Sequence, residues 1–191
     1  MKIGIQGGKG SFNEQALTFH APKLGLNQYE VSYLHTSEAV MRALVEGSID
    51  YGQLALFNSS SGLVEESLSV IGRYPFEVSA HYQLPIQHAL LGGKFATLAT
   101  IDTIITHPQI LPQCKNALAS RFSRIRTESG SGETVDQAKV AELIAAGELP
   151  QNVATIGSEK LAQVFGLQVL ATELHDDPKN ETTFLLLKKF G

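Results

Sequence analysis

The stretch Asn180-Glu181-Thr182-Thr183-Phe184-Leu185-Leu186-Leu187 decides how this chain is expected to fold. A short apolar run that follows polar residues predicts a buried strand. Because this strand comes last, it can pair back onto the first strand of the chain and so join the end of the sequence to its beginning. Successive side chains of a strand face opposite ways, so only one of Thr182 and Thr183 can point into a given cleft.

Upstream of this stretch, short apolar strands alternate with helical segments. We expect strands at 2–6, 30–34, 51–56, 80–91, 103–106, 125–127, 153–156, 168–170 and 184–187, and helices at 11–19, 37–46, 63–70, 108–120, 135–146 and 158–164. This order is typical of α/β proteins with largely parallel sheets. With the last strand returning to the first, it predicts two lobes, one of residues 1–78 plus 165–191 and one of 79–164, and a cleft between them.

Composition excludes several classes of function. The net charge of -4 and the pI near 5.8, with scattered lysines and arginines, argue against a nucleic-acid or membrane-surface partner. The single cysteine, Cys114, excludes an internal disulfide framework and a thiolate zinc cluster. No run approaches the length of a membrane helix, and the first residues form no apolar leader, so we expect a cytoplasmic protein.

The loop Gly7-Gly8-Lys9-Gly10-Ser11 follows the first strand. A loop between strand and helix is a place where backbone N–H groups meet phosphates or carboxylates. It is no Walker motif, because Lys9 is followed by Gly10. Two interpretations of these glycines have equal weight: a loop that binds an anion, and a tight turn whose backbone conformation needs glycine.

Two further polar segments end strands. Asn58-Ser59-Ser60-Ser61-Gly62 follows the third strand, where ligands of open α/β sheets bind, although a helix-capping turn uses the same residue types. Thr106-His107-Pro108-Gln109 closes another strand, and Gln113 follows about one helical turn later. We interpret His107 as a structural hydrogen-bonding residue. The six histidines show no metal-ligand spacing, so we expect no metal, and nothing indicates a cofactor.

Taken together, these segments resemble the prephenate dehydratase family along almost the whole chain. The motifs in order are Gly10-Ser11-Phe12, Asp50-Tyr51-Gly52, Asn58-Ser59, His107-Pro108-Gln109, Gln113-Cys114, Gly166-Leu167, and Asn180 before Thr182 and Phe184. The resemblance implies a two-lobed fold related to type II periplasmic binding proteins. It also implies removal of water and carbon dioxide from prephenate to give phenylpyruvate, on the route to phenylalanine.

The resemblance assigns roles to individual residues. Thr182 matches the threonine of the family's Thr-Arg-Phe motif and would be catalytic, donating a hydrogen bond to the departing hydroxyl. Asn58, Ser59, Thr106 and Gln113 match the other pocket positions of the family. To these expected substrate-binding residues we add Lys9, Ser11, Thr183 and Phe184.

Four positions depart from the family pattern. Thr183 replaces the arginine of Thr-Arg-Phe, which would clamp a carboxylate. Phe57 replaces a glutamate before Asn-Ser, and in the glycine loop Lys9 replaces a glutamate and Gly8 a proline. The region gains positive charge overall, and we expect Lys9 to take over part of the binding of the substrate's carboxylate.

Several alternatives stay open. A relative that decarboxylates prephenate without making an aromatic ring, and a non-catalytic small-anion binding module, share the fold. Arogenate could replace prephenate as the substrate. The resemblance covers only the catalytic domain of the family, without its regulatory ACT domain. A homodimer or homotetramer is a possible assembly.

Overall fold

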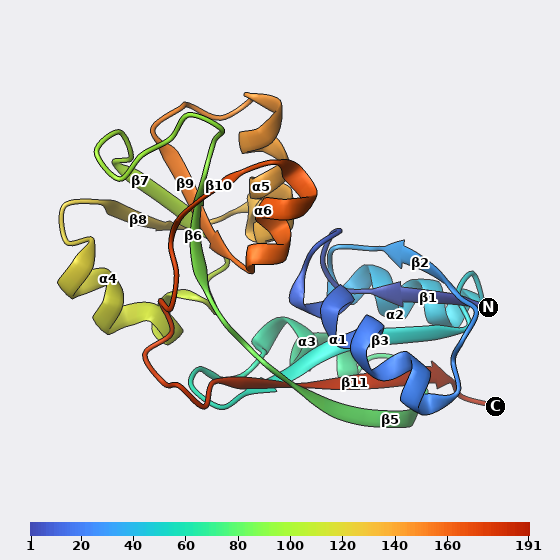
Figure 1. Cartoon of the computed structure of the whole chain (residues 1–191). Helices are drawn as coiled ribbons and strands as arrows, with labels where there is room; N and C mark the ends of the chain where they lie inside the picture. Colours follow the sequence, from blue (N-terminus) through green and yellow to red (C-terminus); the bar gives the residue numbers. More distant parts are fainter. The chain divides into compact units, whose positions relative to one another are not determined.

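The computed structural model describes the backbone of residues 1–191 and every side chain except that of Glu133. The elements in chain order are β1 (Lys2–Ile5), α1 (Phe12–His20), η1 (Ala21–Leu24), β2 (Glu30–Tyr33), α2 (Ser37–Glu46), β3 (Tyr51–Asn58), β4 (Gly62–Leu63), α3 (Glu65–Ile71), β5 (Phe76–Pro85), β6 (Ala89–Gly92), β7 (Thr103–Thr106), η2 (Leu111–Cys114), α4 (Lys115–Arg121), β8 (Arg126–Ser129), η3 (Gly132–Val135), α5 (Gln137–Ala146), β9 (Val153–Gly157), α6 (Glu159–Phe165), β10 (Gln168–Ala171) and β11 (Glu181–Lys189), where η marks a 3₁₀ helix. Figure 1 labels the α-helices and all of these strands except β4. The chain divides into two compact units.

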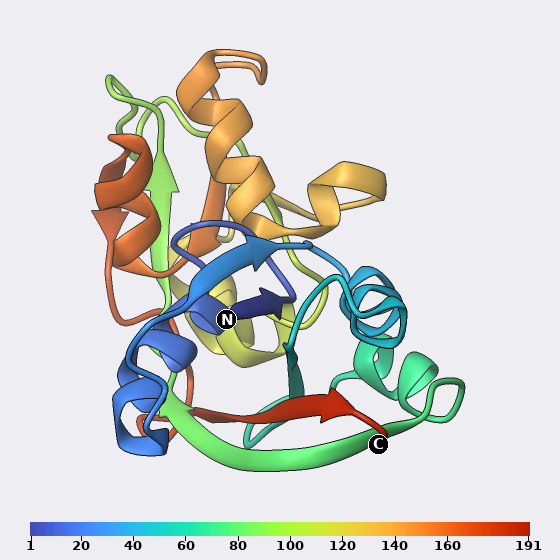
Figure 2. The ribbon, with the colours of Figure 1, turned by 90° about the vertical axis from the view of Figure 1, so that its right-hand side faces the viewer.

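Unit 1 comprises Met1–Gly8, Phe12–Pro85 and Glu181–Gly191. Its sheet has the order β2-β1-β3-β11-β5, with β4 paired to β3. β1, β2 and β3 run parallel, whereas β11 runs antiparallel to both of its neighbours. Figure 2 shows α1 on one side of this sheet and α2 and α3 on the other. The last strand therefore lies inside the sheet rather than at its edge.

Each face of this sheet has its own apolar core. On the α1 side the buried residues are Ile3, Ile5, Ala16, Leu17, Ala21, Tyr82, Phe184 and Leu186. On the α2 side they are Val40, Met41, Leu44, Ile49, Leu54, Val70 and Leu187. Apolar side chains alternate along β11 between the two clusters, as the period of a strand buried on both faces requires.

Unit 2 comprises Lys9–Ser11 and Ile86–Asn180. Its sheet has the order β10-β6-β9-β7-β8. β7 runs parallel to β8 and β9, and β6 runs antiparallel to β9 and β10. One cluster holds residues of α5 and α6, and a second holds Ile104, Ile156 and Cys114.

The sheets are mixed, which corrects the expectation of mostly parallel strands. Among the described strands, four pairings are parallel, β1 with β2 and β3, and β7 with β8 and β9. Five are antiparallel, β11 with β3 and β5, β6 with β9 and β10, and β3 with β4. The reason is that one strand next to the crossings in each unit, β11 in unit 1 and β6 in unit 2, runs opposite to both of its neighbours, and that β4 folds back on β3.

The unit boundaries also differ from the expected residues 79–164. The segment 80–91, expected as one strand, is two strands in two sheets, β5 ending at Pro85 and β6 beginning at Ala89. β5 pairs with β11 in unit 1, and β6 pairs with β9 in unit 2. The main segment of unit 2 therefore runs from Ile86 to Asn180, and Lys9–Ser11 also belongs to this unit.

Helix ends follow local chemistry. α2 begins after Thr36, whose Oγ1 accepts a hydrogen bond from the N–H of Ala39 at 3.2 Å. It ends at Gly47, whose φ of 77° is easily adopted only by glycine. In the described part of the chain, no helix combines the length and apolar character needed to cross a membrane.

Candidate active site

Thr182 and Thr183 lie on opposite faces of β11. Thr182 pairs with Asn58 on β3 and with Leu84 on β5. It shares its face with Phe184 two residues on, which lies in the α1-side core. Thr182 is only 8% exposed. The structure thus separates the two hydroxyls and places that of Thr182 beside Asn58.

The side chain of Asn58 joins the β3–β4 turn to the start of β11. Its Nδ2 donates to Thr182 Oγ1 at 3.0 Å and to the carbonyl oxygen of Glu181 at 3.1 Å. Its Oδ1 accepts from the N–H groups of Ser60 and Ser61 at 3.0 and 2.9 Å, and from the Ser61 hydroxyl at 3.1 Å. Asn58 is 1% exposed, so this amide is a buried and extensively bonded group.

Ser59 binds the same end of β11. Its N–H donates to the carbonyl oxygen of Glu181 at 2.9 Å, and its hydroxyl oxygen accepts from the N–H of Glu181 at 3.0 Å. Ser59 itself is exposed. In unit 1 the structure therefore brings together Asn58, Ser59 and Thr182, although Thr182 follows Asn58 by 124 positions in the sequence.

Thr183 faces the α2 side of the sheet, directly opposite Phe57 on β3. Thr183 is half-buried, and Phe57 is 41% exposed. Directly paired residues of antiparallel strands place their side chains on one face. Two of the four departures from the family pattern, Phe57 and Thr183, are therefore neighbours in space.

Phe184 is part of the core of unit 1. It is 1% exposed and packs in the cluster of Ile3, Ile5 and Leu17. Its ring centroid lies 6.4 Å from that of Tyr82, and the two rings are stacked. This burial accounts for an aromatic residue at this position without a ligand.

In unit 2, Gln113 lies at the centre of a buried polar network. Its Oε1 is 2.8 Å from Nε2 of His88 and accepts from Nδ2 of Asn180 at 2.9 Å. Its own Nε2 donates to the carbonyl oxygen of Gln109 at 2.8 Å. Since Oε1 of Gln113 can only accept, Nε2 of His88 carries the proton in this contact. The side-chain oxygen of Gln113 is thus already bound by two protein donors.

His88 is neutral in this network at physiological pH. Burial, opposed by the hydrogen bond to Gln113 and assisted by the nearby His175, lowers the pKa of its imidazole to about 4. Sequence reasoning missed His88 and the contact of Asn180 with Gln113. Because the three residues are far apart in sequence, no local spacing could have indicated the network.

The remaining predicted residues of unit 2 differ in exposure. Thr106 is fully buried, and its hydroxyl donates to the carbonyl oxygen of Ile156 at 2.9 Å. Ser11 is 2% exposed, whereas Lys9 is exposed. Gly10 has a φ of 81°, so the loop needs glycine there for its backbone alone. Whether the loop also binds an anion stays a prediction.

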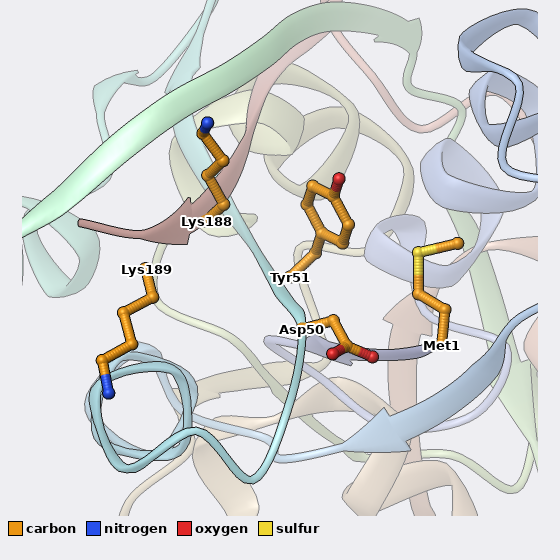
Figure 3. A pocket seen from close by; sticks show the side chains of 5 residues that line it. All are labelled: Met1, Asp50, Tyr51, Lys188 and Lys189. Carbon is orange, nitrogen blue, oxygen red and sulfur yellow. The ribbon is translucent and has the colours of Figure 1, made fainter. Parts of the chain in front are cut away.

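A separate hollow of about 600 Å³ lies at the other end of β11 in unit 1. It is lined by Met1, Asp50, Tyr51, Lys188 and Lys189. Figure 3 shows that Lys188 and Lys189 point away from one another. Lys188 pairs with Glu77 at 2.8 Å, and Asp50 accepts from the N–H of Lys2 at 2.6 Å. These groups do not converge on a common ligand position, so we place the candidate site at the Thr182 end.

Comparison with known proteins decides the family. A family model described as prephenate dehydratase matches residues 3–190, almost the whole chain. The chain belongs to the prephenate dehydratase family. This confirms the resemblance inferred from the order of the motifs.

Members of the prephenate dehydratase family are also among the similar curated proteins. Arogenate dehydratase/prephenate dehydratase 2, chloroplastic, from Arabidopsis thaliana is 27% identical over 99% of this chain and 46% of its own length. The bifunctional chorismate mutase/prephenate dehydratase of Enterobacter agglomerans is 28% identical over 98% of this chain and 47% of its own length. The chain therefore spans about half the length of these relatives.

Solved structures confirm the fold of the prephenate dehydratase family. Prephenate dehydratase from Arthrobacter aurescens, solved in complex with L-Phe, has a TM-score of 0.80 at 23% identity, covering 100% of this chain and 60% of that one. A periplasmic substrate-binding protein of an ABC transporter from Coxiella burnetii has a TM-score of 0.56 at 15% identity, covering 99% and 84%. The predicted likeness to periplasmic binding proteins is thus confirmed at the level of the fold.

Proposed function

We propose that this chain is the catalytic domain of a dehydratase that acts on prephenate or arogenate in aromatic amino acid biosynthesis. Family membership and the names of the relatives support this activity. The observation that carries it is the Thr182 hydroxyl, whose oxygen accepts a hydrogen bond from Asn58. A hydroxyl that accepts from the protein keeps its own proton available for donation.

The reaction needs little acid–base catalysis from the protein. The bond from the ring to its carboxylate breaks and releases carbon dioxide, and its electron pair enters the ring. The bond from the ring to its hydroxyl breaks, and the hydroxide takes up a proton to leave as water. The product from prephenate is phenylpyruvate, and that from arogenate is phenylalanine. Formation of the aromatic ring supplies the driving force.

Thr182 assists the departure of the hydroxyl by hydrogen bonding. A threonine hydroxyl is too weak an acid to release its proton outright at neutral pH, so the proton that completes the water comes from solvent. A positioned donor still stabilises the negative charge that develops on the leaving oxygen. Orientation of the substrate provides further acceleration.

The other predicted residues are proposed to bind the substrate in two ways. Lys9 and Ser59 are exposed and would contact the substrate directly. Lys9 would bind one of the substrate's carboxylates. Four further residues are buried and would support, from beneath, the surface that the substrate contacts: Ser11, Thr106, Gln113 and Phe184. Thr183, on the opposite face of β11 from Thr182, would act only on a group that reaches that face.

The test is turnover of prephenate and, separately, of arogenate, by the wild type and by Thr182→Val and Thr182→Ser. Valine keeps the shape of threonine and removes the hydroxyl, so we expect kcat to fall roughly 10²–10³-fold, as for other lost donors to a developing anion. Serine keeps the hydroxyl and should retain most of the activity. In the same assay Lys9→Ala should raise KM, whereas the exposed Lys160→Ala should not.

Product analysis separates the alternatives. Phenylpyruvate from prephenate, or phenylalanine from arogenate, supports the proposal. A non-aromatic decarboxylated product would identify a decarboxylase instead. Thermal stabilisation by either compound without turnover would identify a binding module. Equal activity of Thr182→Val and the wild type would remove Thr182 from the mechanism.

Compartment and assembly are proposed from the sequence alone. A cytoplasmic location rests on the composition and the absence of a disulfide framework among the residues of this sequence. Immunoblotting of cell fractions tests it, and recovery outside the cytoplasm would contradict it. For the assembly we propose a homodimer or homotetramer, which light scattering of the purified protein distinguishes from a monomer.

A further inference from the structure

The contact between Asn58 and Thr182 has a defined direction. Amide nitrogen and oxygen are told apart by their partners. The end of Asn58 that faces Ser60 and Ser61 meets two backbone N–H donors, at 3.0 and 2.9 Å, so it must be the oxygen. The other end meets the carbonyl oxygen of Glu181 at 3.1 Å, so it must be the nitrogen. The group that faces Thr182 Oγ1 at 3.0 Å is therefore the N–H donor.

This direction constrains the hydroxyl of Thr182. An amide N–H cannot accept a hydrogen bond, so the Thr182 proton cannot point at Asn58. The oxygen of the hydroxyl is occupied by the amide proton, and the hydroxyl can rotate only into positions that aim its own proton elsewhere. A hydroxyl that accepts a hydrogen bond is also polarised into a better donor.

We propose that Asn58 is a positioning residue that forces Thr182 to act as a hydrogen-bond donor toward the substrate, instead of binding the substrate itself. The inference rests on the proposed dehydratase function and adds a cause for the donor role of Thr182. Both N–H groups and the oxygen of Asn58 are bonded inside unit 1, and the residue is 1% exposed. Its effect on the reaction is therefore indirect: it acts through Thr182, which it contacts, and through the turn of Ser60 and Ser61, which it holds.

Asn58→Asp and Asn58→Ala form a matched pair for testing this inference. The carboxylate introduced by Asn58→Asp keeps the acceptor for Ser60 and Ser61 but replaces the donor to Thr182 with an acceptor. Thr182 would then donate its proton to this carboxylate, which withdraws it from the substrate. Alanine removes the turn bonds as well, but it leaves the Thr182 hydroxyl able to rotate toward the substrate.

The expected result is a difference in activity between the two variants that depends on pH. At about pH 8 the kcat of Asn58→Asp should be roughly tenfold lower than that of Asn58→Ala, since a Thr182 hydroxyl that donates to residue 58 cannot donate to the substrate, whereas one with no partner can. Melting temperatures of both variants check that each is folded, because the carboxylate of Asn58→Asp keeps the bonds to the turn but also faces the carbonyl oxygen of Glu181. The activity of Asn58→Asp relative to wild type should rise toward acid pH, because a protonated carboxyl can again donate to Thr182. The relative activity of Asn58→Ala should not change with pH.

Other outcomes overturn the inference. If Asn58→Ala is the less active variant, or if the relative activity of Asn58→Asp is flat with pH, Asn58 serves only the turn. In a Thr182→Val background the effect of Asn58→Asp on kcat should vanish, and persistence of a tenfold loss would show that Asn58 acts through another group. Absence of turnover by the wild type would contradict the proposed function itself, and this outcome is distinguishable from a failure of the inference about Asn58.

A measurement without catalysis covers the case in which Asn58→Asp does not fold. The side-chain amide of Asn58 is followed by NMR in the wild type and in Thr182→Val, which preserves the shape of the residue. Loss of the hydrogen bond should shift the Asn58 amide proton upfield and speed its exchange with solvent. An unchanged resonance would show that the Asn58–Thr182 bond is absent, and the inference would fall.

Discussion

Phe57 and Thr183 show how two departures from a family pattern can be one structural change. They lie opposite each other on β3 and β11 and share a face of the sheet. The resemblance places a glutamate and an arginine at these two positions. Loss of only one of them would leave an unpaired charge on a half-buried surface, which costs stability. The exchange of both residues for uncharged ones avoids that cost.

A double-mutant cycle tests this pairing. Thr183→Arg and Phe57→Glu alone each introduce a lone charge, whereas Phe57→Glu/Thr183→Arg introduces a cross-strand ion pair. We expect the double variant to be more stable than the sum of the single effects by roughly 0.2–1 kcal/mol, measured by urea unfolding.

The control for this cycle is Phe57→Glu/Gln83→Arg, because Gln83 lies on β5, beyond Thr183. That pair should show little coupling. Equal coupling in the two cycles would mean that the effect is a general one of charge, and that residues 57 and 183 do not interact directly.

At the scale of elements, β11 combines a core strand with the candidate site. Its odd and even residues enter two different cores, and Thr182 stands at the point where the apolar run gives way to polar residues. Rigid packing of Phe184 holds the strand on which Thr182 lies. A site on a packed strand is held more precisely than one on a loop.

Phe184→Ala tests whether this residue acts through packing. Because Phe184 is fully buried, we expect the free energy of unfolding to fall by about 3–5 kcal/mol. Phe95→Ala is the control, because Phe95 is 86% exposed and should change stability little. Unchanged stability of Phe184→Ala combined with a raised KM would instead place the ring in contact with the substrate.

The alternation of strands and helices was predictable because it depends on local hydrophobic periodicity. The division of 80–91 into β5 and β6 was not, because it depends on distant partners, β11 and β9. The same limit applies to the site. Asn58 and Thr182 were both predicted, but their hydrogen bond depends on strand register across 124 residues. The contact of His88 with Gln113 left no sequence signal, since a lone histidine is ordinarily a structural residue.

At the scale of the whole molecule, two of the places where the chain passes between its units, 85–86 and 180–181, are adjacent. Glu181 pairs with Pro85 in unit 1, and the N–H of Ile86 donates to the carbonyl oxygen of Asn180 at 2.8 Å in unit 2. Just beyond these crossings, His88 and Asn180 share the side-chain oxygen of Gln113. The buried network therefore ties the two connecting segments together.

This network should make stability depend on pH. The pKa of His88 is about 4 in the folded protein and 6.5 in an unpaired histidine, so the unfolded chain binds the proton first as pH falls. The contribution of neutral His88 is complete above about pH 6.5. We expect a loss on the order of 3 kcal/mol of unfolding free energy as the pH falls to about 4.

Urea unfolding between about pH 4 and pH 7 measures this effect, with His88→Gln as the test variant. Glutamine can still donate to Gln113 but does not titrate, so the pH slope of stability should be smaller than in the wild type. His81→Gln, at an exposed position on β5, should keep the wild-type slope. An unchanged slope in His88→Gln would show that His88 is not the group responsible.

The position of β11 between β3 and β5 also governs the order in which the protein can be completed during synthesis. Every strand of unit 2 precedes residue 181, so that unit can close its sheet while β11 is still being translated. In unit 1, β5 pairs with β11, so it cannot join the sheet until β11 has been synthesised. The unit whose first strand is synthesised earlier is therefore finished last, and until then the strand position between β3 and β5 is empty.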